Sequence, residues 1–218
     1  YPRTLANDCK ALEQAGCDIV FAPTESELYP QPQTFTVQPP KDLADILEGY
    51  FRPGFFTGVA TVVTKLLHCV FNGAKDGGYA VFGEKDFQQL MVIRQLVAQM
   101  AMPIDIVSGA IVRDPSGLAL SSRNGYLSPE QRTQAAGLKA TLQRMSQAVQ
   151  ASASISDIPA IEKQAMDSMR SAGWAPDYMT VRNSTNLLAP RHGDADLIIL
   201  GAAKLGSTRL IDNLRVTL

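Results

Sequence analysis

Lys85 and Asp86 place a cation and an anion on one short turn between two apolar segments. Residues 79–82 have the length and composition of a buried strand, and the apolar spacing of residues 90–97 is typical of a packed helix. Gly83 ends the strand, so backbone N–H groups at the helix start are free to bind an anion. Open α/β sheets bind ligands at this carboxyl end of their strands. Taken alone, the turn is better explained as an ordinary solvated connection.

A second polar cluster, Ser121-Ser122-Arg123, lies just before another helical segment. Hydroxyl groups and a forked guanidinium suit phosphate oxygens, because arginine gives bidentate contacts and is always charged. An ordinary surface turn explains this cluster equally well when it is considered by itself. Together with Lys85, however, it predicts two cations that converge on a polyphosphate. Phosphoryl or nucleotidyl transfer depends mainly on such positioning and electrostatic stabilisation.

The composition argues against several other classes of protein. A net charge of -1 without a basic run gives no nucleic-acid surface, and no apolar run is long enough to span a bilayer. His68 and His192 are the two histidines, so a histidine-rich metal site is not expected. Neither lies in a turn near a nucleophile, so a Ser-His-Asp triad is not expected either. Cys9, Cys17 and Cys69 lack metal-ligand spacing and are expected to be buried, reduced thiols of a cytoplasmic protein.

The remaining pattern predicts an α/β chain of alternating helices and strands. Strands are expected at residues 18–23, 79–82, 104–107, 110–113, 178–182, 197–200 and 208–211, with an edge strand at 34–37. Helices are expected at residues 4–15, 43–47, 59–67, 90–97, 129–150 and 158–172. Ser128, Pro129 and Gln131 form the capping pattern of the fifth helix. A boundary near residue 111 would divide a parallel α/β part from a smaller α+β part.

Two runs of the sequence closely resemble the pantothenate synthetase (pantoate–β-alanine ligase) family. They are residues 82–90 and 117–127, and the resemblance extends over essentially the whole chain. Shorter matches are residues 1–4, 20–23, 47–49, 52–54 and 209–213. The resemblance implies a Rossmann-like nucleotidylyltransferase domain (residues 1–111), with its N-terminal part missing, and a small α+β C-terminal lid domain (112–218). It also implies a homodimer, and Mg²⁺ accompanying ATP.

The reaction that the resemblance implies is ATP-dependent ligation of pantoate and β-alanine. Pantoate is first adenylated, and the amine of β-alanine then attacks the acyl-adenylate, giving pantothenate, AMP and pyrophosphate. Small-molecule substrates are therefore the expected partners, rather than nucleic acid or membrane. No protein metal ligands are expected.

The resemblance also assigns roles to individual positions of this chain. Lys85 would contact phosphate, Asp86 the ribose side, and Gln89 pantoate. The residues implied in ATP binding are Gly83, Glu84, Lys85, Asp86, Val112 (through its backbone), Leu120, Ser121, Ser122 and Arg123. Those implied in catalysis are Lys85, Ser121, Ser122 and Arg123, and those in pantoate binding are Gln89, Tyr1, Val62 and Val63.

The chain also departs from the family pattern. The family's His-x-Gly-His segment and an upstream glutamine are absent, and Phe55, Phe56 and Thr57 stand where the family usually has histidine, phenylalanine and then an arginine. A chain that begins at Tyr1 would lack the first strands of its sheet, so a longer protein is expected and the 218 residues alone are expected to be inactive. One alternative is a fragment or degenerate homologue that binds nucleotide or dimerises without turnover. Another is a different nucleotidyltransferase of similar architecture.

Overall fold

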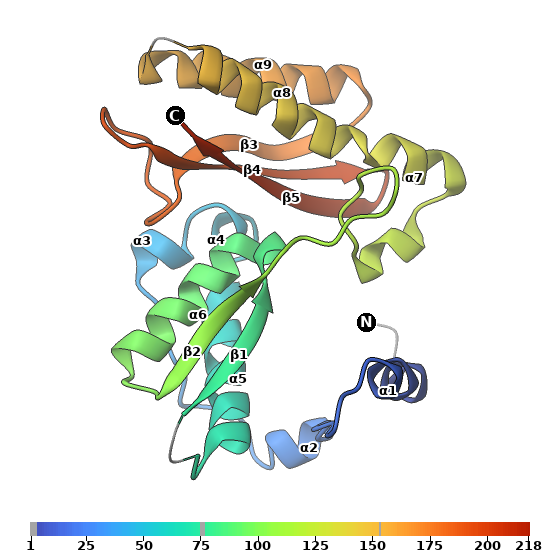
Figure 1. The fold of residues 1–218 in the computed structure, drawn as a ribbon, viewed down its shortest axis with the longest axis vertical. Helices are drawn as coiled ribbons and strands as arrows, with labels where there is room; N and C mark the ends of the chain where they lie inside the picture. Colours follow the sequence, from blue (N-terminus) through green and yellow to red (C-terminus); the bar gives the residue numbers. More distant parts are fainter. Residues whose placement is uncertain (1–3, 75–76, 153) are drawn as a thin grey trace.

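The computed structural model describes residues 4–74, 77–152 and 154–218. The N-terminal half contains helices α1 to α6 and a two-stranded parallel sheet, β1–β2 (Figure 1). Its elements are α1 (Leu5–Gln14), α2 (Glu25–Leu28), α3 (Lys41–Ala44), α4 (Glu48–Phe51), α5 (Phe55–Phe71), β1 (Gly78–Gly83), η1 (Glu84–Asp86), α6 (Phe87–Gln99) and β2 (Ile104–Gly109).

The C-terminal half is a three-stranded antiparallel sheet in the order β3-β4-β5, with α8 and α9 covering one face (Figure 1). Its elements are η2 (Ser122–Tyr126), α7 (Pro129–Ala135), α8 (Gly137–Ala151), η3 (Ile155–Asp157), α9 (Ile158–Ser171), β3 (Ala175–Asn183), β4 (Asp196–Leu205) and β5 (Thr208–Thr217). The mixed α/β class predicted from the sequence is thereby confirmed.

Strand β4 joins the two halves because both of its faces are buried. Side chains of successive strand residues point to opposite faces. Leu197 and Ile199 therefore pack under α8 and α9, while Ile198 and Leu200 pack into the core formed around α5 and α6. The uninterrupted apolar run at 197–200 thus marks the middle strand of the sheet.

The parallel sheet presents different faces to the core and to solvent. Ala80 and Phe82 of β1 pack against the core around α5 and α6. The alternate side chains Tyr79 and Val81 are 74% and 69% exposed, and Val107 of β2 is 42% exposed. The sheet is therefore covered on one face by described residues and open on the other.

Three predicted strands are wrong. Residues 18–23 and 34–37 have no strand structure, and Ile19 is 82% exposed. Residues 110–113 contribute only one bridge, between Arg113 and Ala119. An extended segment becomes a strand only when a neighbouring segment pairs with its backbone groups. Apart from the single bridge at Arg113, no described strand pairs with these three segments.

The predicted helix at 129–150 is two helices. The capping box at Ser128 is confirmed: its hydroxyl accepts from the Gln131 N–H, and the Gln131 side chain accepts from the Ser128 N–H. α7 nevertheless stops at Ala135, and α8 begins at Gly137. Ala136, between the two helices, keeps helical backbone angles (φ -60°, ψ -19°), and Gly137 is a weak helix former at the start of α8.

The expected burial of the cysteines is also wrong. All three are free thiols, and Cys17 and Cys69 are exposed while Cys9 is half-buried. Helix α1, which carries Cys9, buries none of its residues against the described part of the chain. His68 behaves as an ordinary helix residue, with Nδ1 2.8 Å from the carbonyl oxygen of Thr64. None of the described helices is both long and apolar enough to cross a membrane.

Candidate active site

The two polar segments singled out in the sequence meet in the structure. The Lys85 ammonium group donates to the carbonyl oxygen of Leu120 over 3.2 Å, which joins the end of β1 to the segment before η2. A recess of about 40 Å³ beside this contact is lined by Lys85, Asp86, Gln89 and Arg123. The structure therefore brings both predicted cations to one site.

The strand order explains why Lys85 occupies this place. β1 and β2 are parallel and in register up to Gly83 and Gly109, so both strands end at the same edge of the sheet. The chain then tightens into the 3₁₀ turn η1, which presents Lys85 and Asp86, and continues as α6 with Gln89 in its first turn. The recess is thus located at the carboxyl ends of parallel strands, where such sheets bind ligands.

The charges in the recess perturb one another. Partial burial lowers the pKa of Lys85, although the nearby Asp86 and Asp212 carboxylates oppose this effect. Enclosure by protein atoms raises the pKa of Asp86, against the influence of Lys85 and Arg123. The Asp86 side chain itself remains exposed, so it stands in a recess that is crowded at its walls and open to water at its mouth.

The Ser121-Ser122-Arg123 segment has its own local support. The Ser121 hydroxyl accepts from the Arg123 N–H over 3.2 Å and caps the short helix η2. Asn124 is buried and donates from its carboxamide to the carbonyl oxygen of Ala119 over 3.0 Å. These two bonds set the direction in which Arg123 leaves the backbone and enters the recess, whereas Ser122 stays exposed.

Sequence reasoning missed an ionic cluster on the opposite wall. Glu48 is 8% exposed as a residue, and its carboxylate accepts two bonds from the Arg209 guanidinium, over 2.7 and 2.8 Å, and one from the Tyr178 hydroxyl, over 2.7 Å. Arg209 also donates to Asp177 over 2.6 Å. This cluster ties α4 to strands β3 and β5.

The environment of Glu48 fixes its protonation state. Burial alone would raise the pKa of this carboxyl, but hydrogen bonds from Arg209 and Tyr178 outweigh burial and hold the pKa below its usual value. The reciprocal effect appears at Tyr178, where burial and the adjacent carboxylate raise the pKa well above its ordinary value. The available sequence signal was a glutamate between the apolar Leu47 and a glycine, which does not identify its partners.

Arg52 is a third cation of the recess that sequence reasoning missed. Its guanidinium carbon lies 3.5 Å from the centroid of the Phe55 ring, in cation–π geometry, and both residues line the recess. Phe56, the next residue, is buried in the core, and Thr57 follows it on α5. At the position where a histidine was expected, the chain therefore has an aromatic face that holds an arginine.

The other predicted site residues lie at varying distances from this recess. Val112 and Leu120 are exposed, and the Leu120 N–H donates to the Val112 carbonyl oxygen over 2.9 Å. Val62 and Val63 belong to α5 and pack into the core, and neither lines the recess. Tyr1 lies outside the described residues. Gly83 is exposed at the end of β1, and Glu84 pairs with Arg215 over 2.5 Å.

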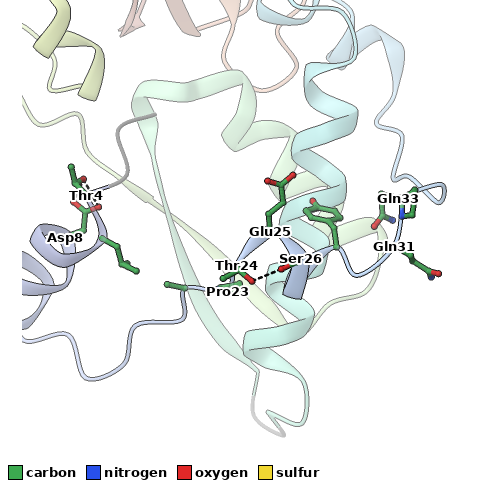
Figure 2. Close-up of a pocket in the computed structure, with 12 residues that line it drawn as sticks. Thr4, Asp8, Pro23, Thr24, Glu25, Ser26, Gln31 and Gln33 are labelled. Carbon is green, nitrogen blue, oxygen red and sulfur yellow. Dashed lines mark hydrogen bonds between the residues drawn. The ribbon is translucent and has the colours of Figure 1, made fainter.

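A much larger hollow lies elsewhere in the described structure. A cavity of about 1210 Å³ is lined by residues of α1, α2 and the chain around them, and Figure 2 labels Thr4, Asp8, Pro23, Thr24, Glu25, Ser26, Gln31 and Gln33 along it. None of the described residues predicted for the site lines this cavity. Volume alone therefore does not mark the site, and the convergence of charged groups is the better guide.

No group of three or more histidine, cysteine, aspartate or glutamate side chains that could hold a metal ion occurs within the described residues. Mg²⁺ bound with a nucleotide takes many of its ligands from phosphate oxygens and water and needs only one or two carboxylates. Asp86 is a carboxylate of the recess that forms no ion pair with any described residue. The side chains present are thus compatible with a metal ion that arrives with a nucleotide.

Comparison with known proteins identifies the family. The family model described as pantoate-beta-alanine ligase matches residues 1–215. The chain is 58% identical over 217 residues to the pantothenate synthetase of Paracidovorax citrulli and 54% identical over 216 residues to that of Verminephrobacter eiseniae. Each match covers 98% of this chain and 76% of the relative. The remainder of each relative lies outside the match.

Solved structures agree with the sequence matches. The pantothenate synthetase of Thermus thermophilus superposes with a TM-score of 0.88 at 37% identity, covering 100% of this chain and 76% of that chain. The pantoate-beta-alanine ligase of Francisella tularensis, crystallised with beta-gamma ATP and beta-alanine, superposes with a TM-score of 0.74 at 30% identity. That match covers 98% of this chain and 70% of that one. The chain therefore belongs to the pantoate–β-alanine ligase, or pantothenate synthetase, family.

Proposed function

We propose that this chain catalyses the ATP-dependent ligation of pantoate and β-alanine to pantothenate, through a pantoyl-adenylate. The observation that carries the proposal is the recess in which Lys85 and Arg123, from two separate segments, face Asp86 and Gln89. Family membership and the nucleotide and β-alanine named for the Francisella tularensis structure supply the substrates.

The first chemical step explains why the recess needs cations. A carboxylate oxygen of pantoate attacks the α-phosphorus of ATP, and the bond from that phosphorus to the bridging oxygen breaks to release pyrophosphate. Both reactants are anions, so they repel each other until fixed positive charge offsets the repulsion. Lys85 and Arg123 supply that charge, and preorganised charge in a site sheltered from water lowers the barrier strongly.

The second step needs no new charged group. The amine nitrogen of β-alanine attacks the acyl carbon of the adenylate, the carbon–oxygen bond to AMP breaks, and the nitrogen loses a proton. Water must be kept from the activated acyl group during this exchange.

We assign the remaining residues by the family resemblance, and only Asp86 and Gln89 among them line the recess. In the recess, Asp86 faces the ribose and Gln89 donates to pantoate. Tyr1, Val62 and Val63 are assigned to the pantoate wall from the resemblance alone, because neither valine lines the recess. The adenine and phosphate groups are placed along Gly83, Glu84, Val112, Leu120, Ser121 and Ser122. Asp86 would be the carboxylate that holds a Mg²⁺ ion bound with ATP, and the ion would supply positive charge that offsets the phosphates.

The proposal extends to the architecture. Residues 1–111 form the nucleotide- and pantoate-binding domain and residues 112–218 the lid. The hydrophobic cluster under α8 and α9 lies wholly within the second range, whereas the cluster around α5 and α6 also includes Leu187, Ile198 and Leu200. The working form is a cytoplasmic homodimer, and its oligomeric state is measurable by sedimentation.

The deciding assay is pantoate-dependent exchange of labelled pyrophosphate into ATP. Lys85→Ala is expected to lower the exchange rate by about 10²- to 10³-fold, as loss of one charge-stabilising donor does in other enzymes. The matched control is Lys204→Ala, because Lys204 is exposed on β4 and lines no part of the recess. Unchanged exchange in Lys85→Ala contradicts the assigned role.

The same assay separates the alternatives. Exchange that does not require pantoate indicates another nucleotidyltransferase. Nucleotide binding without any exchange indicates a homologue that has lost turnover. The structural reason to test for this outcome is Phe55, which stands beside Arg52 where a histidine was expected.

A further inference from the structure

Two adjacent side chains of β5, Asp212 and Asn213, reach both polar segments of the site. They are 5% and 3% exposed, respectively, so their polar atoms are bonded within the protein rather than to bulk water. Neither was predicted as a site residue. Burying a polar group without a hydrogen bond destabilises the folded state, so such groups almost always have partners. The partners of Asp212 and Asn213 therefore show what these side chains hold in place.

Asn213 holds the turn that carries Lys85. Its carboxamide nitrogen donates to the carbonyl oxygens of Glu84 and Lys85, each over 2.9 Å. A carboxamide has two N–H donors, and both are used on consecutive carbonyl groups of η1. The Asn213 backbone N–H donates in turn to the Asp212 carboxylate over 2.8 Å, which fixes the direction of the side chain.

Asp212 holds the second segment. Its carboxylate accepts two bonds from the Arg113 guanidinium, over 2.7 and 2.9 Å, and Arg113 also donates to the carbonyl oxygen of Gly117 over 3.1 Å. The turn closed in this way leads directly to Leu120, whose carbonyl oxygen receives the Lys85 ammonium group. One strand therefore fixes both segments that form the recess.

We propose that Asn213, supported by Asp212, is a positioning residue for adenylation: it sets the backbone of the Lys85 turn so that the ammonium group faces Arg123 across the recess. The inference rests on the function proposed above. Lysine has a flexible stem, so the place of its charge depends on the backbone from which the stem leaves. A misplacement of about 1 Å in a positioned group can cost about 10²-fold in rate.

The test compares Asn213→Ala with the matched control Asn186→Ala, because Asn186 is an exposed residue of the same half whose carboxamide oxygen accepts only from Leu188. Asn213→Ala is expected to lower kcat of pantoate-dependent exchange by about 10- to 100-fold, with KM for ATP within about 3-fold. The loss falls on kcat because the displaced charge acts mainly on the transition state, while the contacts of Ser121 and Arg123 with ground-state ATP persist. Asn186→Ala is expected to leave both constants unchanged.

A second measurement does not depend on activity. Amide hydrogen exchange in a peptide covering residues 84–90 is expected to become about 10-fold faster in Asn213→Ala, while peptides of α8 keep the wild-type rate. If the alanine variant does not fold, Asn213→Leu replaces it, since leucine keeps the branched shape without the donors.

The outcomes separate the two proposals. If the wild-type protein is inactive but amide exchange in the 84–90 peptide is faster in Asn213→Ala, the proposed ligase activity is refuted. The hold of Asn213 on the Lys85 turn is then retained. An unchanged kcat with unchanged amide exchange at 84–90 overturns the positioning role. So does a uniform acceleration of amide exchange in all peptides, which indicates a purely structural role.

Discussion

Replacing Glu48 by glutamine tests whether the buried ionic cluster joins the two halves of the molecule. The substitution keeps the size and shape of the side chain but removes its charge. Three donors lose a carboxylate partner: two nitrogens of Arg209, at 2.7 and 2.8 Å, and the Tyr178 hydroxyl, at 2.7 Å. The side chains of Glu48 and Arg209 are 10% and 16% exposed, so water replaces these bonds poorly.

The expected cost follows from this geometry. Removing one partner of a buried ion pair destabilises a protein by about 3–5 kcal/mol. Arg209 retains Asp177 at 2.6 Å, so its charge is not left alone, and glutamine still offers one acceptor. The lower end applies, and we expect the free energy of unfolding to fall by about 3 kcal/mol. For a chain of this size, that corresponds to a drop in Tm of about 6–12 °C.

Urea unfolding followed by circular dichroism measures this difference. The control is Glu13→Gln, an exposed glutamate of α1, which is expected to change stability by less than about 0.5 kcal/mol. The cycle formed with Tyr178→Phe should give a coupling energy of about 1 kcal/mol or more, because the two side chains share a bond. A loss below about 1 kcal/mol in Glu48→Gln would refute the inference that this cluster holds the halves together.

Three further outcomes are expected. The folded-state pKa of Glu48 lies below its ordinary value of 4.5. The stabilisation from this carboxylate is therefore complete above pH 4.5 and is lost as the pH falls through the folded-state pKa. Glu48→Gln should lack this part of the decrease in unfolding free energy at acid pH. Gly49→Ala should destabilise by about 3 kcal/mol in urea unfolding, because an added Cβ would lie 1.6 Å from the backbone oxygen of Ala44, while Gly58→Ala, with no atom within 4 Å, should be neutral or stabilising by about 0.5 kcal/mol. Arg123→Ala should raise the KM for ATP in pyrophosphate exchange by about 10-fold through loss of a charge-assisted contact.

Each of these has a contrary result. Identical acid-side slopes in wild type and Glu48→Gln would mean that the carboxyl is not held ionised by its neighbours. Equal stability of the two glycine variants would mean that the approach of Gly49 to Ala44 relaxes freely. An unaltered ATP dependence in Arg123→Ala would place phosphate binding elsewhere.

Local patterns predicted the elements that local forces determine. The capping box at Ser128 identified the start of α7 correctly because the hydrogen bonds of a cap involve residues only three apart. The run at 197–200 identified β4 because burial on both faces leaves no polar position within that run. The apolar run at 18–23 has the same appearance, yet it forms no strand, since pairing depends on a neighbour that the local sequence does not describe.

The site shows the same division. Lys85 and Arg123 were predicted from the chemistry of their own segments, and the structure brings them together. Glu48 and Asn213 were not predicted, because each has an ordinary local sequence and gains its importance from a partner far along the chain. Arg52 was missed although its partner, Phe55, lies only three residues away. Local sequence indicates the chemistry that a side chain can perform, but it does not identify the residues that the side chain contacts in the folded protein.

The bonds from β5 to the recess also bear on the order in which the molecule assembles. Asn213 is separated by 129 residues from Glu84, and Arg209 by 161 residues from Glu48. Contacts of such separation close very long loops and form late, after local helices and hairpins. On the ribosome, the Lys85 turn would be synthesised well before β5 emerges to hold it. A nascent chain would therefore acquire its nucleotide site abruptly and late. ATP binding measured on chains of increasing length would then show the point at which β5 packs against the Lys85 turn.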